Sequence, residues 1–168
     1  MPRQQAIKLL IDGVWVEGDG ESISVVDKYS GQPIGLIQGA STDQVDAAVA
    51  AARRSFESVK LEPHERYRLL MRVADLIEAN REALADLIIS ESGVPWKDSN
   101  NEVGRAAETF RLSAEEARRL VGEMVPIQGA AGQSHRMAFT IRVPRGVVGG
   151  ISSFNSPLNM VAHKVAPA

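Results

Sequence analysis

A short apolar run near the C-terminus, residues 147–151, constrains the fold more than any other feature. It reads Val-Val-Gly-Gly-Ile without polar alternation, which is typical of a strand covered on both faces in a parallel sheet. Ser156 and Pro157 then supply an N-cap and first-turn pair, so a helix is expected to follow. Its inward face would carry Leu158, Val161, Ala162 and Val165. One strand–loop–helix unit cannot form a parallel sheet, because each strand needs neighbours. We therefore expect an incomplete α/β fold, either the N-terminal part of a larger protein or a chain that depends on another.

The residues before this unit change from a strand period to a helical period at Ser41. Short apolar runs separated by turn signals such as Asp12-Gly13 predict a small antiparallel layer over residues 7–40. Four amphipathic helices are expected next. Their expected bounds are Ser41 to Val59, Pro63 to near Asn80, Glu82 to Gly93, and Ser99 to Gly122. The fourth would begin with a capping box formed by Ser99 and Glu102. Alternating apolar residues over 137–143 then predict a half-buried strand.

Charge and composition exclude several classes of function. The 168 residues contain 19 Lys and Arg against 21 Asp and Glu, a formal net charge of -2, so the basic footprint of a nucleic-acid binder is missing. The absence of cysteine excludes disulfides, thiolate metal sites and a thiol nucleophile within this chain. The 3 histidines have no metal-ligand spacing, and no metal site is expected.

No leader and no membrane span are expected. Lys8 splits the apolar run at the N-terminus, whereas a secretory signal needs about 7–15 apolar residues there. The longest uncharged stretch, residues 146–162, contains Ser-Ser-Phe-Asn-Ser-Pro at its centre, which a bilayer-spanning helix would not tolerate. The sequence therefore predicts a cytoplasmic protein without a membrane partner.

The loop between the expected strand and helix is the first candidate site. Open α/β sheets bind ligands at the carboxyl ends of their strands. Asn155 in this loop offers a neutral side-chain donor of the kind that stabilises an oxyanion without titrating. The alternative is that Asn155 only satisfies the backbone of its own turn, as asparagine commonly does.

Residues 146–168 resemble the strand, loop and helix of the aldehyde dehydrogenase superfamily, whose usual loop is Pro-Trp-Asn-Phe-Pro followed by Lys-x-x-Pro-Ala. The upstream order agrees, with a strand layer, an Asp-Ala-Ala-Val-Ala-Ala-Ala block at 46–52 and a Glu-x-x-Arg helix ending in Ala-Glu-Glu-Ala-Arg. The resemblance covers nearly all of this chain but only about the first third of a family member. It implies a small strand layer, four helices, a bridging strand and the first strand–helix unit of a Rossmann-like sheet.

The resemblance also implies a division into three segments. Residues 1–132 would be the strand and helical part of the NAD(P)-binding domain. Residues 133–145 would be a bridging strand used in oligomerisation, and residues 146–168 would begin the Rossmann-like core. A homo-oligomer is implied for the full-length protein.

Several site residues follow from the same resemblance. Asn155 matches the family's oxyanion-stabilising asparagine. The loop that lines the nicotinamide side of the NAD or NADP site matches Ile151, Ser152, Ser153, Phe154 and Asn155. Lys164 matches a lysine near the catalytic base, and the alternative for it is a helix surface charge. Ser153-Phe154-Asn155-Ser156 replaces Pro-Trp-Asn-Phe, which resembles the Phe-Asn branch of non-phosphorylating glyceraldehyde-3-phosphate, lactaldehyde and phosphonoacetaldehyde dehydrogenases.

Arg105 is the candidate for substrate binding. It matches the arginine of the Glu-x-x-Arg helix, which in relatives acting on anionic aldehydes faces the charged group of the substrate. A guanidinium suits phosphate or carboxylate through paired hydrogen bonds. The alternative is that Arg105 pairs with Glu102 or Glu108 along its own helix.

The implied activity is NAD(P)-dependent oxidation of a small-molecule aldehyde to a carboxylic acid through a cysteine thioester. The cysteine, the glutamate that activates water, the glycine-rich pyrophosphate loop and the lysine near the adenosine ribose would all follow residue 168, so this chain alone is expected to be inactive. Two alternatives stay open. One is a non-catalytic truncated paralogue that acts as an interaction module, and the other is a self-contained helical domain with an unrelated loop.

Overall fold

The N-terminal strands form where short runs rich in β-branched and aliphatic residues are separated by tight turns. The computed structural model describes residues 6–168 of the chain, so residues 1–5, the first part of the segment on which the leader prediction rests, lie outside it. β2 (Leu9–Ile11) and β3 (Val14–Val16) form an antiparallel hairpin. Asp12 and Gly13 make its turn with φ of 51° and 76°, a region that favours glycine and asparagine-like residues.

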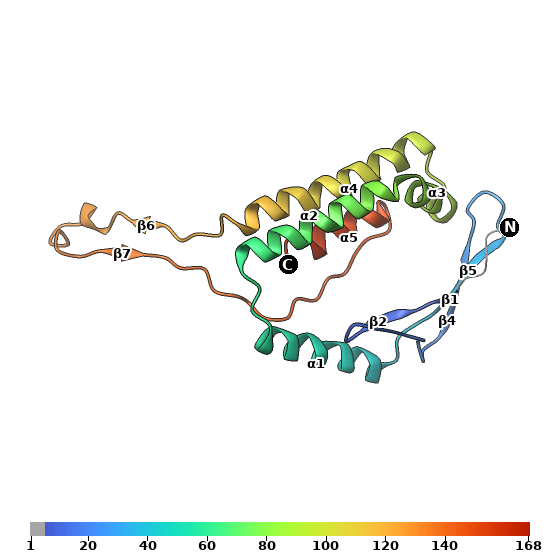
Figure 1. Cartoon of the computed structure of the whole chain (residues 1–168), viewed down its shortest axis with the longest axis horizontal. Coiled ribbons are helices and arrows are strands. Elements are labelled where there is room, and N and C mark those ends of the chain that lie inside the picture. The colour runs from blue at the N-terminus through green and yellow to red at the C-terminus, as the bar shows by residue number, and fades with distance from the viewer. Residues whose placement is uncertain (1–5) are drawn as a thin grey trace.

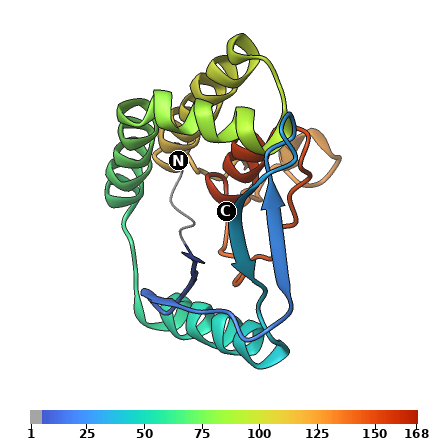
Figure 2. The same ribbon diagram turned by 90° about the vertical axis from the view of Figure 1, so that its right-hand side faces the viewer.

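A second, three-stranded sheet joins the N-terminal region to the helices. β4 (Ser22–Val26) pairs antiparallel with β5 (Pro33–Gln38), and β1 (Ala6–Ile7) adds parallel to β5. The predicted antiparallel layer is confirmed, with one parallel strand that the sequence did not indicate. Figure 2 shows β4 and β5 running between α1 and the helical bundle, and the backbone N–H of Lys28 donates to the carbonyl of Ser90 at 3.0 Å.

The first helix, α1 (Thr42–Ser58), begins where the sequence predicts. The Ser41 hydroxyl accepts from the backbone N–H of Gln44 at 3.3 Å, and the Gln44 side chain accepts from the Ser41 N–H at 3.1 Å. The Gln44 amide also donates to the carbonyl of Glu17 at 2.7 Å, which ties the start of α1 to the strands.

A helical bundle forms the core (Figure 1). It contains α2 (Pro63–Ala79), α3 (Arg81–Ser92), α4 (Trp96–Ala117) and α5 (Pro157–Val165), and α4 packs against the other three. The small side chains of the core allow these helices to pack close to one another. The buried core consists of Ala74, Ile77, Ala85, Ile88, Val103, Ala106, Ala107, Phe110, Ala162 and Ala166. The bounds of α2 and α3 confirm the prediction, including the left-handed Gly93 at the end of α3.

The predicted bounds of α4 are wrong at both ends. The helix begins at Trp96 after Pro95, whose extended backbone occupies the N-cap position, and it ends at Ala117 rather than at Gly122. Ser99 is therefore inside the helix, fully buried, where its hydroxyl donates to the carbonyl of Pro95 at 3.3 Å. The predicted capping box of Ser99 does not form.

An extended arm follows α4 and projects away from the bundle (Figure 1). In it β6 (Met124–Val125) pairs antiparallel with β7 (Ala138–Phe139), and a short 3-10 helix (Ile127–Gly129) lies between them. The strand predicted over residues 137–143 is thus only two residues long, because its partner strand, β6, is itself only two residues long. Its alternating apolar side chains are exposed.

The segment predicted as a buried strand, residues 147–151, forms no strand and has no strand partner within residues 6–168. Ile151 is 92% exposed, so burial on both faces is wrong for this chain. The predicted inward face of α5 is also partly wrong. Ala162 is buried against the bundle and Leu158 is partly buried there, as predicted, and Asn159 is buried beside them, whereas Val161 and Val165 are exposed. None of the described helices is both long enough and apolar enough to cross a membrane.

Candidate active-site loop and its support on α4

The start of α5 is capped by a side chain from another helix. Ser156 occupies the N-cap position, as predicted, but its side chain makes no capping hydrogen bond. Instead Oε1 of Glu102, on α4, accepts from the backbone N–H of Leu158 at 2.8 Å and of Asn159 at 3.1 Å. Glu102 is 4% exposed. The carboxylate therefore satisfies two N–H groups of the first turn of α5 from inside the bundle.

The N–H groups of this first turn are all accounted for. Pro157 has no N–H, Leu158 and Asn159 donate to Glu102, and Met160 donates to the carbonyl of Ser156 at 2.8 Å. A helix N-terminus often binds anions through its free N–H groups, but here these groups are occupied. The first turn of α5 therefore has no free N–H group to offer to an anionic ligand.

Asn155 lies on the exposed loop directly before Ser156. The Ser153 hydroxyl donates to its Oδ1 at 2.7 Å. This bond occupies the carbonyl end of the amide and leaves the Nδ2 end to donate elsewhere. In the described part of the chain, the side chain of Asn155 thus bonds to Ser153 rather than to the backbone of its own turn. Its role as an oxyanion donor stays a prediction.

Lys164 lies beside the beginning of the same loop. A Cβ built on Gly150 would be only 3.2 Å from Cβ of Lys164, so the lysine stem packs closely over this glycine. Ile151 and Phe154 expose apolar surface on this loop, and Lys164 is itself exposed. Residues 6–168 bring together no group of three His, Cys, Asp or Glu residues suited to a metal ion.

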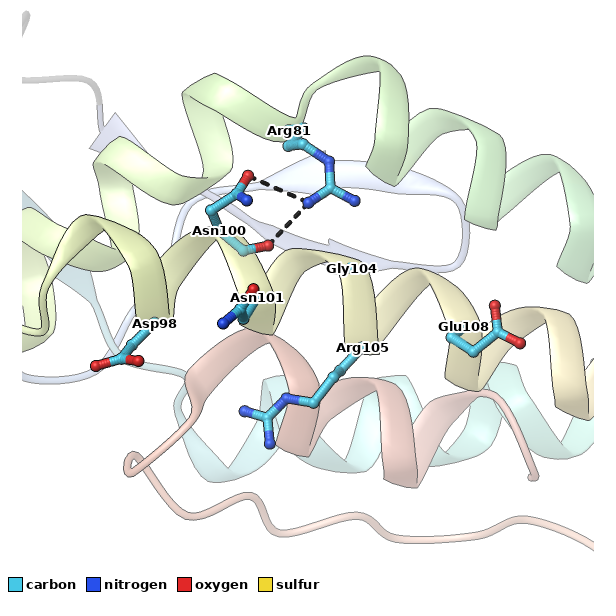
Figure 3. A pocket seen from close by; sticks show the side chains of 7 residues that line it. All are labelled: Arg81, Asp98, Asn100, Asn101, Gly104, Arg105 and Glu108. Atoms are coloured by element: carbon cyan, nitrogen blue, oxygen red, sulfur yellow. Dashed lines mark hydrogen bonds between the residues drawn. The ribbon is translucent and has the colours of Figure 1, made fainter.

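Arg105 lies three residues after Glu102 on α4 and lines a polar hollow of about 730 Å³ (Figure 3). The hollow is lined by Arg81, Asp98, Asn100, Asn101, Gly104, Arg105 and Glu108. The alternative pairing of Arg105 with Glu102 or Glu108 does not occur among residues 6–168. Glu102 is bound to α5, and Glu108 pairs with Arg111 at 3.6 Å.

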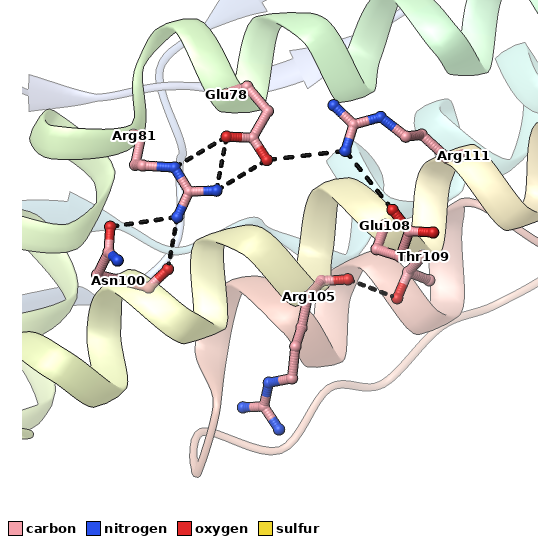
Figure 4. Close-up of polar contacts among 7 residues, drawn as sticks. All are labelled: Glu78, Arg81, Asn100, Arg105, Glu108, Thr109 and Arg111. Atoms are coloured by element: carbon pink, nitrogen blue, oxygen red, sulfur yellow. Dashed lines mark hydrogen bonds and ion pairs between the residues drawn. The ribbon is translucent and has the colours of Figure 1, made fainter.

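The other guanidinium groups near the hollow are engaged within the bundle (Figure 4). Arg81 pairs with Glu78 at 2.6 Å and donates to the carbonyl of Asn100 at 2.8 Å. Arg111 lies 3.8 Å from the other oxygen of Glu78. Figure 4 shows the Arg105 side chain pointing away from this network. Of Arg81, Arg105 and Arg111, only Arg105 makes no side-chain ion pair within residues 6–168, and its role in substrate binding stays a prediction.

The structure brings some of the predicted residues together. Asn155 is in contact with Ser153, and α4 reaches their loop through Glu102. Arg105 follows one turn later on α4, but the lining of its hollow does not include Asn155. The sequence analysis missed the role of Glu102. The available signal was a carboxylate on the inward stripe of α4 beside Val103, because a buried charge requires a polar partner.

Comparison with known proteins agrees with this architecture. Residues 15–168 match the profile of the aldehyde dehydrogenase family. The chain is 44% identical over 160 residues to a 3-sulfolactaldehyde dehydrogenase of Priestia aryabhattai, covering 95% of this chain and 33% of the relative.

Two solved structures are similar as well. An NADP-dependent glyceraldehyde-3-phosphate dehydrogenase from Bacillus halodurans, complexed with NADP, superposes with a TM-score of 0.88 at 38% identity, covering 98% of this chain and 35% of the other. An NAD-dependent benzaldehyde dehydrogenase from Corynebacterium glutamicum has a TM-score of 0.84 at 33% identity, covering 96% and 35%. The chain spans about a third of the length of the relatives it matches, and the predicted fold, the N-terminal part of an aldehyde dehydrogenase-like α/β fold, is confirmed. The chain belongs to the aldehyde dehydrogenase family.

Proposed function

We propose that this chain forms the N-terminal third of an NAD- or NADP-dependent aldehyde dehydrogenase that oxidises an aldehyde to a carboxylic acid through a cysteine thioester. The nucleophilic cysteine and the glutamate base would belong to the catalytic part that follows residue 168. The observation that carries the proposal is the loop at Asn155, where Ser153 bonds Oδ1 and leaves the amide nitrogen as a donor.

The role of Asn155 follows from the charge that develops on the aldehyde oxygen. When a thiolate adds to the carbonyl carbon, the C=O π bond breaks and its electron pair becomes an oxyanion. The N–H of Asn155 would donate to this oxygen, and a neutral amide does so without titrating. The first-turn N–H groups of α5 are already bonded, so Asn155 would supply a hydrogen bond that this helix terminus does not offer.

The same loop supports a role in cofactor binding. Ile151 and Phe154 present exposed apolar surface of the kind that suits the face of a nicotinamide ring. Ser152 and Ser153 provide hydroxyls beside them. When bound, NAD(P)+ accepts the hydride from the aldehyde carbon. The similar structures from Bacillus halodurans and Corynebacterium glutamicum are NADP- and NAD-dependent enzymes, respectively.

The division of the chain follows as part of the proposal. Residues 1–132 would belong to the cofactor domain, residues 133–145 to a strand that bridges subunits of a homo-oligomer, and residues 146–168 to the Rossmann-like core. The exposed apolar side chains in and beside β7, those of Met137, Phe139, Ile141 and Val143, support the second of these assignments. The cytoplasmic location stays a prediction.

Purification of the full-length protein, in which these 168 residues are followed by the catalytic part, tests this function. We expect aldehyde-dependent reduction of NAD+ or NADP+, followed by absorbance of the reduced nicotinamide, with a carboxylic acid as the product. A folded full-length protein that reduces neither cofactor with a panel of anionic and neutral aldehydes would favour the interaction module.

Arg105 is expected to select anionic aldehydes. Arg105→Ala in the full-length protein should raise KM for a phosphorylated or sulfonated aldehyde by about 10- to 100-fold, because a charge-assisted hydrogen bond is lost. KM for a neutral aldehyde of the same carbon skeleton should be unchanged. Arg119→Ala is the matched control, since Arg119 is exposed and pairs only with Glu116 among the described residues. Equal effects of Arg105→Ala on both aldehydes would show that Arg105 is structural.

A further inference from the structure

We propose that Glu102 is a positioning residue for this site: by capping α5 from the interior of the bundle, it sets the place of Asn155. The inference rests on the proposed role of Asn155 as the oxyanion donor. It adds a residue on a different helix, 53 positions earlier in the chain, that acts through Asn155 and does not touch the substrate.

The geometry supports this role because the loop has few other anchors. Residues 151–155 are exposed, and residues 147–151 have no strand partner within the described part of the chain. The first firm attachment after the loop is the pair of hydrogen bonds from Leu158 and Asn159 to Glu102. Asn155 is only three residues before Leu158, so a shift of the first turn of α5 would move the amide of Asn155.

Local capping cannot replace Glu102. The Ser156 side chain makes no capping bond, and Pro157 supplies no N–H. Asn159 is 7% exposed, so water has little access to its side of the turn. Without an acceptor at the position of Glu102, two N–H groups at the start of α5 would lose their partner.

Glu102 also connects the two halves of the candidate site. Arg105 follows it by three residues on α4, a spacing that places two side chains on neighbouring parts of one helix surface. The same helix therefore holds the proposed oxyanion donor through Glu102 and presents the proposed anion-binding guanidinium. The relative position of the two groups is set by one rigid element.

Two conservative variants test separately the length of the Glu102 side chain and its charge. Glu102→Asp keeps the charge but withdraws the carboxylate by one methylene, whereas Glu102→Gln keeps the reach and an acceptor oxygen. In this chain, hydrogen exchange of the Leu158 and Asn159 amides should become about tenfold faster in Glu102→Asp, the scale of a lost helix cap. Glu102→Gln should stay close to the parent, and so should the control Glu116→Asp at an exposed position of α4. Unchanged exchange in Glu102→Asp would overturn the proposal.

Kinetics of the full-length protein complete the test as a double-mutant cycle with Asn155→Ala. Glu102→Asp should slow acylation by about 10- to 100-fold, the scale of a misplacement of about 1 Å, and Glu102→Gln should rescue most of it. In the Asn155→Ala background, Glu102→Asp should change the rate by less than about twofold, since both act through one donor. Equal losses in both backgrounds would refute the positioning role while leaving the proposed function intact. An unchanged acylation rate in the single variant Asn155→Ala would instead refute the proposed role of Asn155 as the oxyanion donor.

Discussion

Replacing Asn155 by alanine should slow acylation in the full-length protein by about 10²–10³-fold, or roughly 2.7–4 kcal/mol, which is the usual cost of removing one oxyanion donor. The loss should fall on the chemical step, because the amide meets negative charge only after the thiolate has added to the carbonyl. Single-turnover formation of the reduced nicotinamide measures this step directly. Binding of NAD(P) should change much less.

Asn155→Asp is the matched variant for this experiment. Aspartate keeps the size of the side chain and an oxygen to accept from Ser153, but it replaces the amide donor with a second carboxylate oxygen. We expect a loss at least as large as that of alanine, because a carboxylate would repel the oxyanion. Acylation within about twofold of the parent in either folded variant would mean that Asn155 does not act as an oxyanion donor.

Local signals in the sequence predicted those parts of the fold that depend on neighbouring residues. The capping box of Ser41 with Gln44 and the left-handed Gly93 after α3 satisfy backbone groups within a few residues, and Pro63 in the first turn of α2 lacks the N–H that would have no acceptor there. These features need no tertiary partner, and the structure contains all three.

Predictions failed where the outcome depends on a distant partner. Glu102 has the spacing of a capping box with Ser99, yet Pro95 begins the helix earlier and the carboxylate bonds to α5, 56 and 57 residues away. Likewise, an apolar run such as residues 147–151 becomes a paired strand only beside another strand. No such neighbour exists within residues 6–168.

The candidate site shows the same division. Its chemical groups, Asn155 and Arg105, were predicted because their residue types match the chemistry and the family pattern. The hydrogen bonds that hold this site in place were not predicted. The bond from Ser153 to Asn155 depends on side-chain rotamers, and the cap from Glu102 depends on how α4 and α5 pack. The buried face of α5 was only partly predicted for the same reason, because Asn159 is buried beside the predicted Ala162 while Val161 and Val165 are exposed.

The second large effect concerns this chain by itself, which should lack aldehyde oxidation activity. It contains no cysteine, so no thiolate is present to take up the aldehyde carbon. The hydroxyls of Ser152 and Ser153 are weak nucleophiles at neutral pH unless a base activates them. Turnover should fall on the order of 10⁶-fold below that of the full-length protein, the scale reached when a nucleophile is removed from its enzyme.

Contaminating host dehydrogenases are the main source of error in that measurement, and the absence of cysteine provides the control. Iodoacetamide alkylates the nucleophilic thiol of a contaminating enzyme of this family but has no thiol to attack in this chain. Activity that disappears on alkylation therefore comes from a contaminant. Activity that survives alkylation, rises in proportion to the concentration of the chain and consumes both aldehyde and NAD(P)+ would contradict the thioester mechanism. In the full-length protein the same reagent should abolish turnover, because there the thiolate is the group that forms the bond to the aldehyde carbon.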